Sequence, residues 1–280
     1  MKNIQAKKSL GQNFLRSETT IEKIIDASGI FPGDIVIEVG PGEGALTNAL
    51  LNAGAHVIAI EKDTRCIPIL TDRFADALRD GHLILLEGDI LEKNITRELF
   101  DELLGNVPTY KVVANIPYYI TGMLFRYFLE EHRAPSQLTF LVQKEVAEQI
   151  VSRNKKETIL SLSIKIFGDP VYVATVPKES FDPVPKVDSA ILMITNISKQ
   201  RIEDFTEKEF FTLIKAGFRA KRKMLVGNLS EGLGIHKDKI IEYFDELSID
   251  KKARGEDLPI GTWMWLTKKI SSHTKHPHEK

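Results

Sequence analysis

Short apolar runs of five to seven residues recur along the first 195 residues of the chain. Runs of this length are typical of buried strands, and we predict strands at 35–39, 56–60, 82–86, 110–114, 137–142, 172–176 and 189–195. Apolar residues around them follow the spacing of amphipathic helices, which predicts helices at 19–28, 44–53, 65–78, near 96–104 and at 121–132. Strands that alternate with helices indicate a parallel, doubly wound sheet with right-handed crossovers.

The alternation changes after residue 142. Helices are expected at 146–151 and 159–167, and the last two strands follow each other across a proline-rich stretch, which favours an antiparallel last strand. From Ile197 onward, helical spacing predicts helices at 207–218, 221–231, 237–246 and 260–270. We therefore predict an α/β domain with a mainly parallel sheet over 1–198, a small all-α domain over 199–270 and a disordered tail over 271–280.

A glycine-rich string, IVIEVGPGEGALT, spans Ile35–Thr47, between the first predicted strand and the next helix. Because glycine tolerates positive φ and close approach to the backbone, such a loop can place its N–H groups and a helix N-terminus against a ligand. Glu61 ends the next strand, 21 residues after Gly40, where nucleotide-binding folds place a carboxylate for ribose hydroxyls. The alternative is a plain strand-to-helix turn.

The glycine spacing, GxGxG, departs from the dinucleotide fingerprint GxGxxG. It resembles instead the first motif of S-adenosylmethionine (SAM) methyltransferases, which carries an acidic residue where Glu38 stands. Asp89, in the string EGDI after the third strand, stands where this fold is expected to meet the adenine edge of the nucleotide, a step that rests on analogy between folds. The alternative is an acidic residue that caps the next helix.

The string NIPYY begins at Asn115 and directly follows the fourth predicted strand. The exocyclic amine of a base is a poor nucleophile because its lone pair is delocalised into the ring. The Asn115 amide oxygen and the Ile116 carbonyl would accept its two N–H bonds and favour the developing positive charge. Pro117 would stiffen the loop, and Tyr118 offers a ring for stacking on a base. The string resembles the (N/D)PPY-type motif of enzymes that methylate amino nitrogens; a simple turn is the alternative.

Phe181, in the proline-rich string SFDPVPKVDS, is a candidate for a second aromatic ring that holds the base after it leaves its stack. The alternative is a core phenylalanine beneath the loop. The predicted catalytic residues are therefore Asn115, Ile116, Pro117, Tyr118 and Phe181.

Composition argues against several classes of protein. No run approaches the roughly 20 apolar residues that span a bilayer, and the first residues lack the apolar core of a signal peptide. We therefore expect a cytoplasmic protein without membrane association. The single cysteine, Cys66, lies in a helical pattern and is interpreted as a packing residue. Three histidines lie in the polar tail, and no metal site is expected.

The formal net charge is −1, but cationic residues gather in two stretches without acids, residues 1–17 and the segment between Lys215 and Leu229. The candidates for contact with a polyanion are Lys7, Lys8, Arg219, Lys221, Arg222 and Lys223. A single such cluster would be interpreted as a solvated face. Two clusters that flank a nucleotide-type domain favour an anionic polymer as partner.

Several strings occur together in order: SLGQNFL, EVGPGEGALT, GDI, NIPYYIT, FDPVPKVDSA and FRAKRKMLVGNL. From about residue 5 to 268, the chain resembles the ribosomal RNA adenine N6-dimethyltransferases. The resemblance implies that SAM is the cofactor. It also implies the cofactor contacts: Asn13 and Leu15 close over SAM, Gly40 meets the methionine end, Glu61 the ribose hydroxyls, Asp89 the adenine, and Asn115 both the cofactor and the target nitrogen.

The family resemblance further implies a substrate: two adjacent adenosines in the 3′-terminal hairpin of small-subunit rRNA, each methylated twice during ribosome biogenesis. It implies that the C-terminal helical domain grips RNA phosphates through Lys221, Arg222 and Lys223. The sequence departs from the family pattern at Thr121-Gly122 and at Ala220-Lys221, which bears on substrate detail. We expect a monomer.

Three alternatives stay open at this stage. Resistance-type methyltransferases share the catalytic domain and act on large-subunit RNA, although FRAKRKMLVGNL and the stretch Ala253–Trp263 resemble the small-subunit group better. A protein-glutamine methyltransferase has a similar NPPY-type motif but lacks the paired basic clusters. A non-catalytic assembly or checkpoint factor would keep the fold without turnover.

Overall fold

The computed structural model describes residues 4–7, 10–131 and 133–275. Two compact units divide the chain. The first contains the residues up to Ala147 together with Asp169–Ile197, and the second contains Glu148–Gly168 together with the residues from Ser198 onward. A division therefore falls between Ile197 and Ser198, beside the predicted one. Glu148–Gly168, however, was placed in the first domain by the sequence and belongs to the second unit, because its helical part packs against the C-terminal helices.

A seven-stranded sheet forms the centre of the first unit, in the order β4-β3-β2-β5-β6-β9-β7. Its strands are β2 (Ile35–Val39), β3 (His56–Glu61), β4 (Leu83–Glu87), β5 (Lys111–Asn115), β6 (Gln137–Gln143), β7 (Asp169–Val176) and β9 (Ser189–Thr195). The pairs among β2, β3, β4, β5 and β6 are parallel, whereas β9 is antiparallel to both β6 and β7. The predicted mainly parallel sheet with an antiparallel last strand is confirmed.

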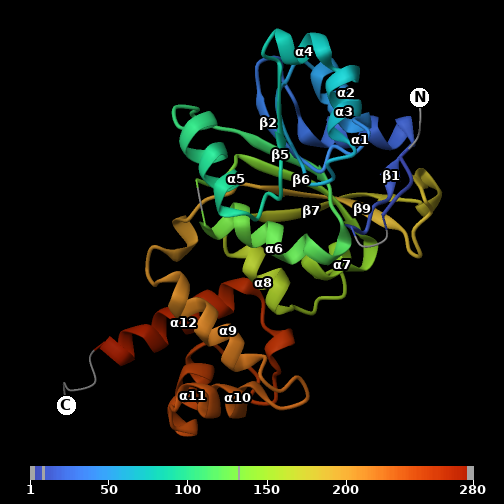
Figure 1. The fold of residues 1–280 in the computed structure, drawn as a ribbon. Helices are drawn as coiled ribbons and strands as arrows, with labels where there is room; N and C mark the ends of the chain where they lie inside the picture. Colours follow the sequence, from blue (N-terminus) through green and yellow to red (C-terminus); the bar gives the residue numbers. More distant parts are fainter. Residues whose placement is uncertain (1–3, 8–9, 132, 276–280) are drawn as a thin grey trace. The chain divides into compact units, whose positions relative to one another are not determined.

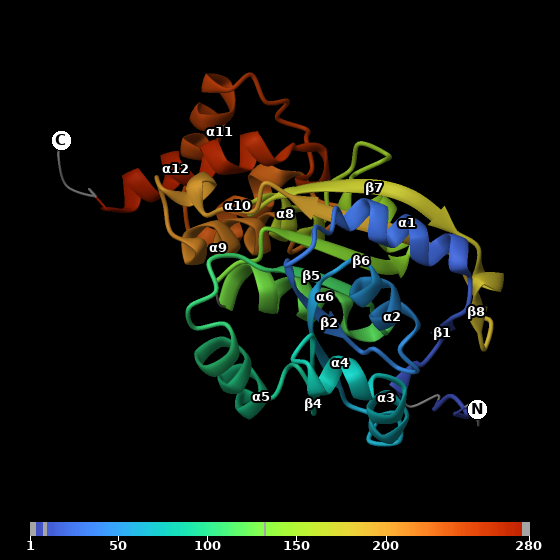
Figure 2. The same cartoon turned by 90° about the horizontal axis from the view of Figure 1, so that it is seen from above.

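Helices cover both faces of this sheet (Figures 1 and 2). On one face, α1 (Glu18–Ser28), α2 (Ala45–Asn52) and α3 (Ile67–Arg73) bury Ile24, Leu50 and Leu70 in one cluster with Val36 and Val113 of the strands. On the other face, Phe125 of α6 (Thr121–Arg126) packs against Phe140 of β6, with ring centroids 5.1 Å apart. Burial on both faces explains why the strands are continuous apolar runs.

Some helices differ from their predicted bounds. The helix predicted at 65–78 is interrupted at Phe74, which separates α3 from α4 (Ala75–Arg79). The helices predicted near 96–104 and at 121–132 each continue as a π-helical segment, Glu98–Leu103 after α5 (Lys93–Arg97) and Tyr127–Glu131 after α6. A separate two-stranded sheet, β1 (Phe14–Leu15) with β8 (Phe181–Asp182), was not predicted because neither strand is long enough to show a pattern.

The second unit is helical. Its helices are α8 (Ile159–Lys165), α9 (Glu207–Gly217), α10 (Leu225–Leu233), α11 (Lys237–Glu246) and α12 (Ile260–Lys275), while α7 (Lys144–Ile150) lies across the division of the chain. The core contains Phe210, Phe244 and Trp263, each 0% exposed. A capping box between Thr206 and Glu209 explains where α9 begins.

Two predictions for this unit need correction. The helix predicted at 221–231 begins only at Leu225, so the basic string lies in the turn between α9 and α10. The predicted disordered tail is wrong for residues 271–275, which continue α12 because Ile270 and Ser271 are still buried against the unit. Residues 276–280 lie outside the described residues. Within the described part of the chain, no helix is long and apolar enough to cross a membrane.

Candidate active site

A cavity of about 260 Å³ lies where the parallel strands of the first unit end. Its walls come from the segments that follow β2, β3, β4 and β5 and from the amino-terminal segment, residues 10–16. Carboxyl ends of parallel strands are the usual ligand position in doubly wound sheets. The cavity brings together these sequence-predicted residues: Asn13, Leu15, Gly40, Glu61, Asp89, Asn115, Ile116, Pro117 and Tyr118.

The glycine-rich loop has positive φ at Gly40, Gly42 and Gly44 (72°, 58° and 81°). At Gly44 a Cβ would stand 2.5 Å from the Phe74 ring, so this glycine is needed for packing as well as for its backbone conformation. Nothing lies within 4 Å of a Cβ at Gly40, which lines the cavity. Gly40 therefore leaves space beside the backbone for a bound group.

Glu61 is 5% exposed and is held by the backbone. Its Oε1 accepts a hydrogen bond from the Asp63 N–H (2.7 Å), and its Oε2 accepts one from the Gly42 N–H (2.8 Å). Burial raises the pKa of Glu61 more than these hydrogen bonds lower it. Each carboxylate oxygen has a further lone pair, so this fixed side chain can accept bonds from two neighbouring hydroxyls.

Asp89 lies beyond β4 and has two partners. Lys62 Nζ lies 2.7 Å from its Oδ2, and the Leu91 N–H donates to its Oδ1 at 3.0 Å. Burial raises the pKa of Asp89, but these hydrogen bonds outweigh burial and the pKa is lowered overall. The carboxylate is therefore charged at neutral pH, and the Leu91 bond also fits the helix-capping alternative because it holds the turn before α5.

Asn115 is the last residue of β5, and its amide is oriented by the amino-terminal segment. The side-chain Nδ2 donates to the Asn13 carbonyl oxygen at 3.0 Å. Among residues 4–7, 10–131 and 133–275, no group donates to the Asn115 Oδ1. Because the bond to the Asn13 carbonyl uses one amide N–H and fixes the orientation of the amide, the Oδ1 remains available to accept hydrogen bonds from a substrate.

The residues after Asn115 differ in exposure. The Ile116 side chain is 2% exposed, so only its backbone can act on a ligand. The Tyr118 hydroxyl lies 2.8 Å from Ser189 Oγ of β9, which fixes the ring at the cavity wall, and burial raises the pKa of this hydroxyl. Tyr119 also lines the cavity and is 58% exposed.

Phe181 is the one predicted catalytic residue that does not line the cavity. It is 3% exposed and packs in the hydrophobic cluster with Leu15, Ile24 and Ile191. The reason is the pairing of β1 with β8, which places Phe181 opposite Leu15. The structure thus agrees with the core alternative for this residue.

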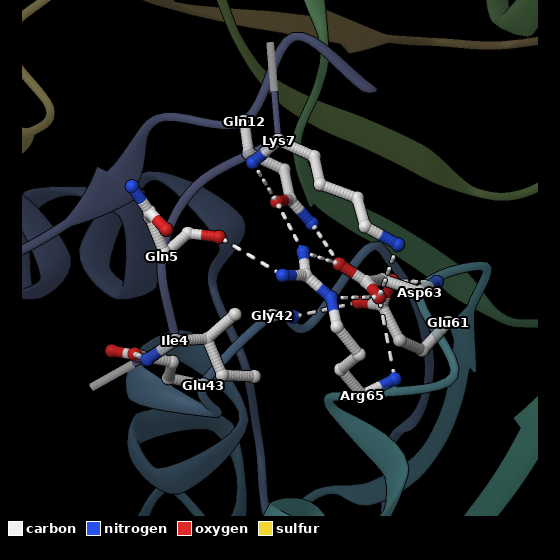
Figure 3. Close-up of polar contacts among 9 residues, drawn as sticks. All are labelled: Ile4, Gln5, Lys7, Gln12, Gly42, Glu43, Glu61, Asp63 and Arg65. Atoms are coloured by element: carbon white, nitrogen blue, oxygen red, sulfur yellow. Dashed lines mark hydrogen bonds and ion pairs between the residues drawn. The ribbon is translucent and has the colours of Figure 1, made fainter. Parts of the chain in front are cut away.

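Three residues that were not predicted as site residues, Gln12, Asp63 and Arg65, bind one another beside Glu61 (Figure 3). Arg65 Nε donates to Asp63 Oδ1 at 2.9 Å, and Gln12 Nε2 donates to Asp63 Oδ2 at 2.8 Å. The spacing EKDTR, with an acid and a base two residues apart after the ribose carboxylate, was the only available signal.

Glu38 was noted only as part of the glycine-rich motif. It lines the cavity, is 1% exposed, and accepts a 2.6 Å hydrogen bond from Thr47 Oγ1. Burial raises the pKa of Glu38 to about 8. This carboxyl group is therefore largely protonated at neutral pH.

The candidate RNA-binding residues occupy different settings. Lys7 Nζ lies 3.8 Å from Asp63 Oδ1 and so faces the cofactor side of the unit, while Lys8 lies outside the described residues. In the turn between α9 and α10, the exposed cationic residues are Arg219, Lys221, Arg222 and Lys223. Asn228 Nδ2 holds this turn by donating to the carbonyls of Gly217 (2.7 Å) and Ala220 (3.1 Å).

The chemistry of the cavity fits SAM. A fixed carboxylate at Glu61 suits vicinal hydroxyls, the open backbone at Gly40 admits a close group, and Ile60, Ile90 and Met123 supply apolar wall. Within the described part of the chain, no cluster of three or more His, Cys, Asp or Glu side chains could hold a metal ion. Cys66 is 0% exposed and burial raises its pKa to about 12, which agrees with a packing role.

Comparison with known proteins identifies the family. The model of the family described as ribosomal RNA adenine dimethylase matches residues 3–271. The chain is 41% identical over 263 residues to ribosomal RNA small subunit methyltransferase A of Dehalococcoides mccartyi (strain CBDB1), covering 94% of this chain and 88% of that protein. It is 38% identical over 273 residues to the protein of the same name from Clostridioides difficile (strain 630), covering 96% and 92%.

Solved structures agree in fold. A dimethyladenosine transferase from Plasmodium falciparum has a TM-score of 0.74 at 25% identity, covering 94% of this chain and 98% of that chain. The 23S rRNA methyltransferase ErmE has a TM-score of 0.72 at 22% identity, covering 92% and 100%. A family-model match along nearly the whole chain and relatives well above 30% identity lead to one conclusion: this protein belongs to the ribosomal RNA adenine dimethylase family, whose members are SAM-dependent methyltransferases.

Proposed function

We propose that this protein dimethylates the N6 amino groups of two adjacent adenosines in the 3′-terminal hairpin of small-subunit rRNA, with SAM as methyl donor, during ribosome biogenesis. The observation that carries the proposal is the setting of Asn115. Its amide nitrogen is held by the Asn13 carbonyl, which leaves its oxygen for a substrate amine in the same cavity as Glu61 and Asp89.

SAM supplies an electrophilic methyl group when bound. Glu61 would hold the ribose hydroxyls with a carboxylate that two backbone N–H groups keep in place, and Asp89 would meet the adenine. Asn13 and Leu15 would cover the cofactor, and Gly40 would leave space for its methionine end. Each of these residues lines the cavity.

The chain's own part in the methyl transfer is to orient an amine. The Asn115 Oδ1 and the Ile116 carbonyl would accept the two N–H bonds of the adenine N6, which favours the positive charge that develops there. Tyr118, fixed by Ser189, would stack on the base, and Pro117 would restrict the loop. A general base is not required, because the proton can leave to solvent after the methyl group arrives.

The RNA target is supported by the names of relatives and by charge. The relatives from Dehalococcoides mccartyi and Clostridioides difficile are named small subunit methyltransferases. In the helical unit, Arg219, Lys221 and Arg222 are exposed on one turn, whereas Lys223 lies 3.6 Å from Glu231 and is partly neutralised. We infer that this turn contacts RNA phosphates.

The direct test incubates the protein with labelled SAM and unmethylated small ribosomal subunits and maps modified adenosines by mass spectrometry. Dimethyladenosine at two adjacent 3′-end positions is the expected result. Label in large-subunit RNA instead would assign the protein to the resistance type. SAM binding without label in either RNA would favour a non-catalytic role in assembly.

The contribution of the basic turn is tested by the salt dependence of RNA binding. The double variant Lys221→Ala/Arg222→Ala should lower the slope of log K against log salt by about 1 per removed phosphate contact. The matched control is Lys251→Ala/Lys252→Ala, which removes the same charge elsewhere in the helical unit. Equal slopes in both double variants would show that the turn does not contact RNA.

We also propose that the protein acts as a monomer in the cytoplasm. The relatives named as ribosomal RNA methyltransferases support the cytoplasmic setting. Light scattering of the purified protein, alone and with SAM, tests the first point: a mass near 31.6 kDa is expected.

A further inference from the structure

The Asp63 carboxylate is the centre of a polar network that reaches across 51 residues of sequence to Gln12 (Figure 3). Asp63 has a side chain that is 0% exposed. Arg65 binds it in bidentate fashion, with Nε 2.9 Å from Oδ1 and Nη2 2.5 Å from Oδ2. Lys7 Nζ lies 3.8 Å from Oδ1. Planar bidentate pairs of this kind are the strong form of a charged hydrogen bond.

Arg65, the main cation of the network, binds residues of the amino-terminal segment. Arg65 Nη1 donates to the Gln5 carbonyl at 3.1 Å, and Arg65 Nη2 lies 3.4 Å from Gln12 Oε1. Gln12 Oε1 in turn accepts the Lys7 N–H at 2.9 Å, so the network also closes the segment on itself. A separate bond from the Ile4 N–H to Glu43 Oε1 (3.0 Å) ties the beginning of the segment to the glycine-rich loop.

Both ends of the network connect to the predicted active site. The Asp63 N–H donates to Glu61 Oε1, so the residue that holds the segment also positions the ribose carboxylate. Gln12 is followed by Asn13, whose carbonyl accepts the Asn115 amide. Gly11, one residue before Gln12, lies against Tyr119, with a Cβ position 3.3 Å from that ring. The segment therefore walls the cavity and touches the NIPYY loop.

Electrostatics explain why replacing Asp63 or Arg65 would destabilise this network. The hydrogen bond from Arg65 holds the pKa of Asp63 well below its usual range, so the carboxylate stays charged. A buried carboxylate that loses its cation is strongly unfavourable. In contrast, residues 4–7 and 10–13 form no strand, and only Leu10 has 3₁₀-helical geometry, so the backbone alone does little to hold this part of the chain in place.

We propose that Asp63 and Arg65 are positioning residues that clamp the amino-terminal segment over the cofactor cavity and so orient the Asn115 amide through the Asn13 carbonyl. The inference rests on the cofactor site proposed above. It assigns neither residue to contact with the reacting atoms. Because the segment lines the cavity and its Asn13 carbonyl holds Asn115, release of the clamp changes both the retention of bound SAM and the orientation of Asn115.

The test compares Arg65→Ala and Asp63→Asn with Arg79→Ala. Arg79 forms an exposed ion pair with Asp76 on α4, so its replacement is a matched loss of one arginine. Two readouts are used: tryptic cleavage after Lys7, followed by mass spectrometry with and without SAM, and steady-state kinetics. Both clamp variants should be cleaved about tenfold faster or more, with faster SAM dissociation, a higher KM for SAM and a lower kcat.

Arg65→Lys serves as the rescue variant. A lysine can pair with Asp63 but cannot bond Gln5 and Gln12 at the same time, so its cleavage rate should lie between those of the wild type and Arg65→Ala. Arg79→Ala should match the wild type in all readouts. Unchanged cleavage and unchanged KM in both clamp variants would overturn the proposal, and so would a loss of thermal stability with unchanged cleavage.

The clamp proposal and the cofactor-site proposal are contradicted by different patterns of SAM binding among the variants. If Glu61→Ala binds SAM as tightly as the wild type, the site assignment is wrong, whatever the clamp variants do. If Glu61→Ala weakens binding while Arg65→Ala and Asp63→Asn do not, the site stands and the clamp is wrong. Cleavage without SAM reports on the segment independently of the cofactor.

Discussion

Two regions wall the cavity, and they are built in different ways. The strand-end wall consists of the loops after β2, β3, β4 and β5, each carried by a strand whose register is fixed by a buried parallel sheet. The amino-terminal segment, residues 10–16, has only the two-residue strand β1 and is held by side-chain bonds and by pairing with β8.

This difference distinguishes Glu61, which is expected to bind the cofactor, from Asn115, which is expected to orient the substrate amine. In the strand-end wall, Glu61 is held by the backbone N–H groups of Gly42 and Asp63, which lie in the loops directly after β2 and β3. Asn115, by contrast, depends on a carbonyl that is 102 residues distant in sequence. We therefore expect substitution of Glu61 to weaken cofactor binding, and substitutions that release the amino-terminal segment to affect both binding and methyl transfer.

The largest expected effect comes from Phe181, which holds β8 and with it β1. Phe181→Ala should lower the free energy of unfolding by about 3–5 kcal/mol, because it leaves a cavity beside Leu15 and Ile24. Denaturant unfolding measures the change. The control is Val184→Ala, 58% exposed in the same loop. Normal stability with lost turnover would instead return Phe181 to the base-holding role suggested by the sequence.

The second effect concerns methyl transfer itself. Asn115→Ala should lower kcat by about 10²- to 10³-fold, the size seen when one oriented hydrogen-bonding group is lost from an active site. The dissociation constant for SAM should change less, because Glu61 and Asp89 remain. Single-turnover methylation and calorimetry separate the two quantities. Full activity in this variant would rule out the amine-orienting role.

Glu61→Ala tests the strand-end wall. Binding of SAM should weaken by about 10- to 100-fold, since hydrogen bonds to a charged group contribute roughly 1.5–3 kcal/mol. Glu87 is the matched control, because it lies opposite Glu61 in the register of β4, is exposed, and does not line the cavity. Calorimetric titration with SAM gives both values, and similar losses in the two variants would contradict the assignment.

A further expected effect is a pH dependence of stability due to Glu38. Its folded pKa is raised to about 8 from 4.5, so the folded protein keeps a proton that the unfolded chain releases. The resulting stability is fully present below pH 4.5 and is lost as pH rises toward 8. Glu38→Gln should flatten this decline, and Tm measured between pH 5 and pH 8 shows the difference. An unchanged pH profile, with Glu87→Gln as control, would show that Glu38 titrates normally.

Local pattern explains why most of the fold could be predicted. The strands Ile35–Val39 and Ser189–Thr195 occur at their predicted bounds, because buried strands leave short, mainly apolar runs bounded by turn residues. The interruption at Phe74 could not be foreseen, since it follows from packing of that ring against Gly44. The late beginning of α10 likewise reflects Asn228, which holds the preceding turn through bonds to Gly217 and Ala220.

The candidate site likewise contains residues that the sequence could reveal and residues that it could not. Glu61, Asp89 and Asn115 stand at strand ends, and a motif can reveal them because topology alone brings strand ends to one edge of the sheet. Phe181 was predicted to hold the base, whereas the structure buries it opposite Leu15. A two-residue strand carries no periodicity from which this burial could be inferred. Asp63 and Arg65 escaped notice because their partners, Gln5 and Gln12, are remote in sequence.

The sequence by itself determined the sheet, its cofactor-binding edge and the family of this protein, because all three depend on hydrophobic periodicity and on short strings within single strand-to-helix units. Only the tertiary structure decided that Asn115 is oriented by Asn13, that Phe181 is buried, and that Asp63 and Arg65 hold the amino-terminal segment. These features depend on contacts between residues remote in sequence: Asp63 and Gln12 are 51 positions apart, Asn115 and Asn13 are 102 apart, and Phe181 pairs with Leu15. Side-chain geometry at such separations is set by how the elements pack, and a local pattern of residues does not record it.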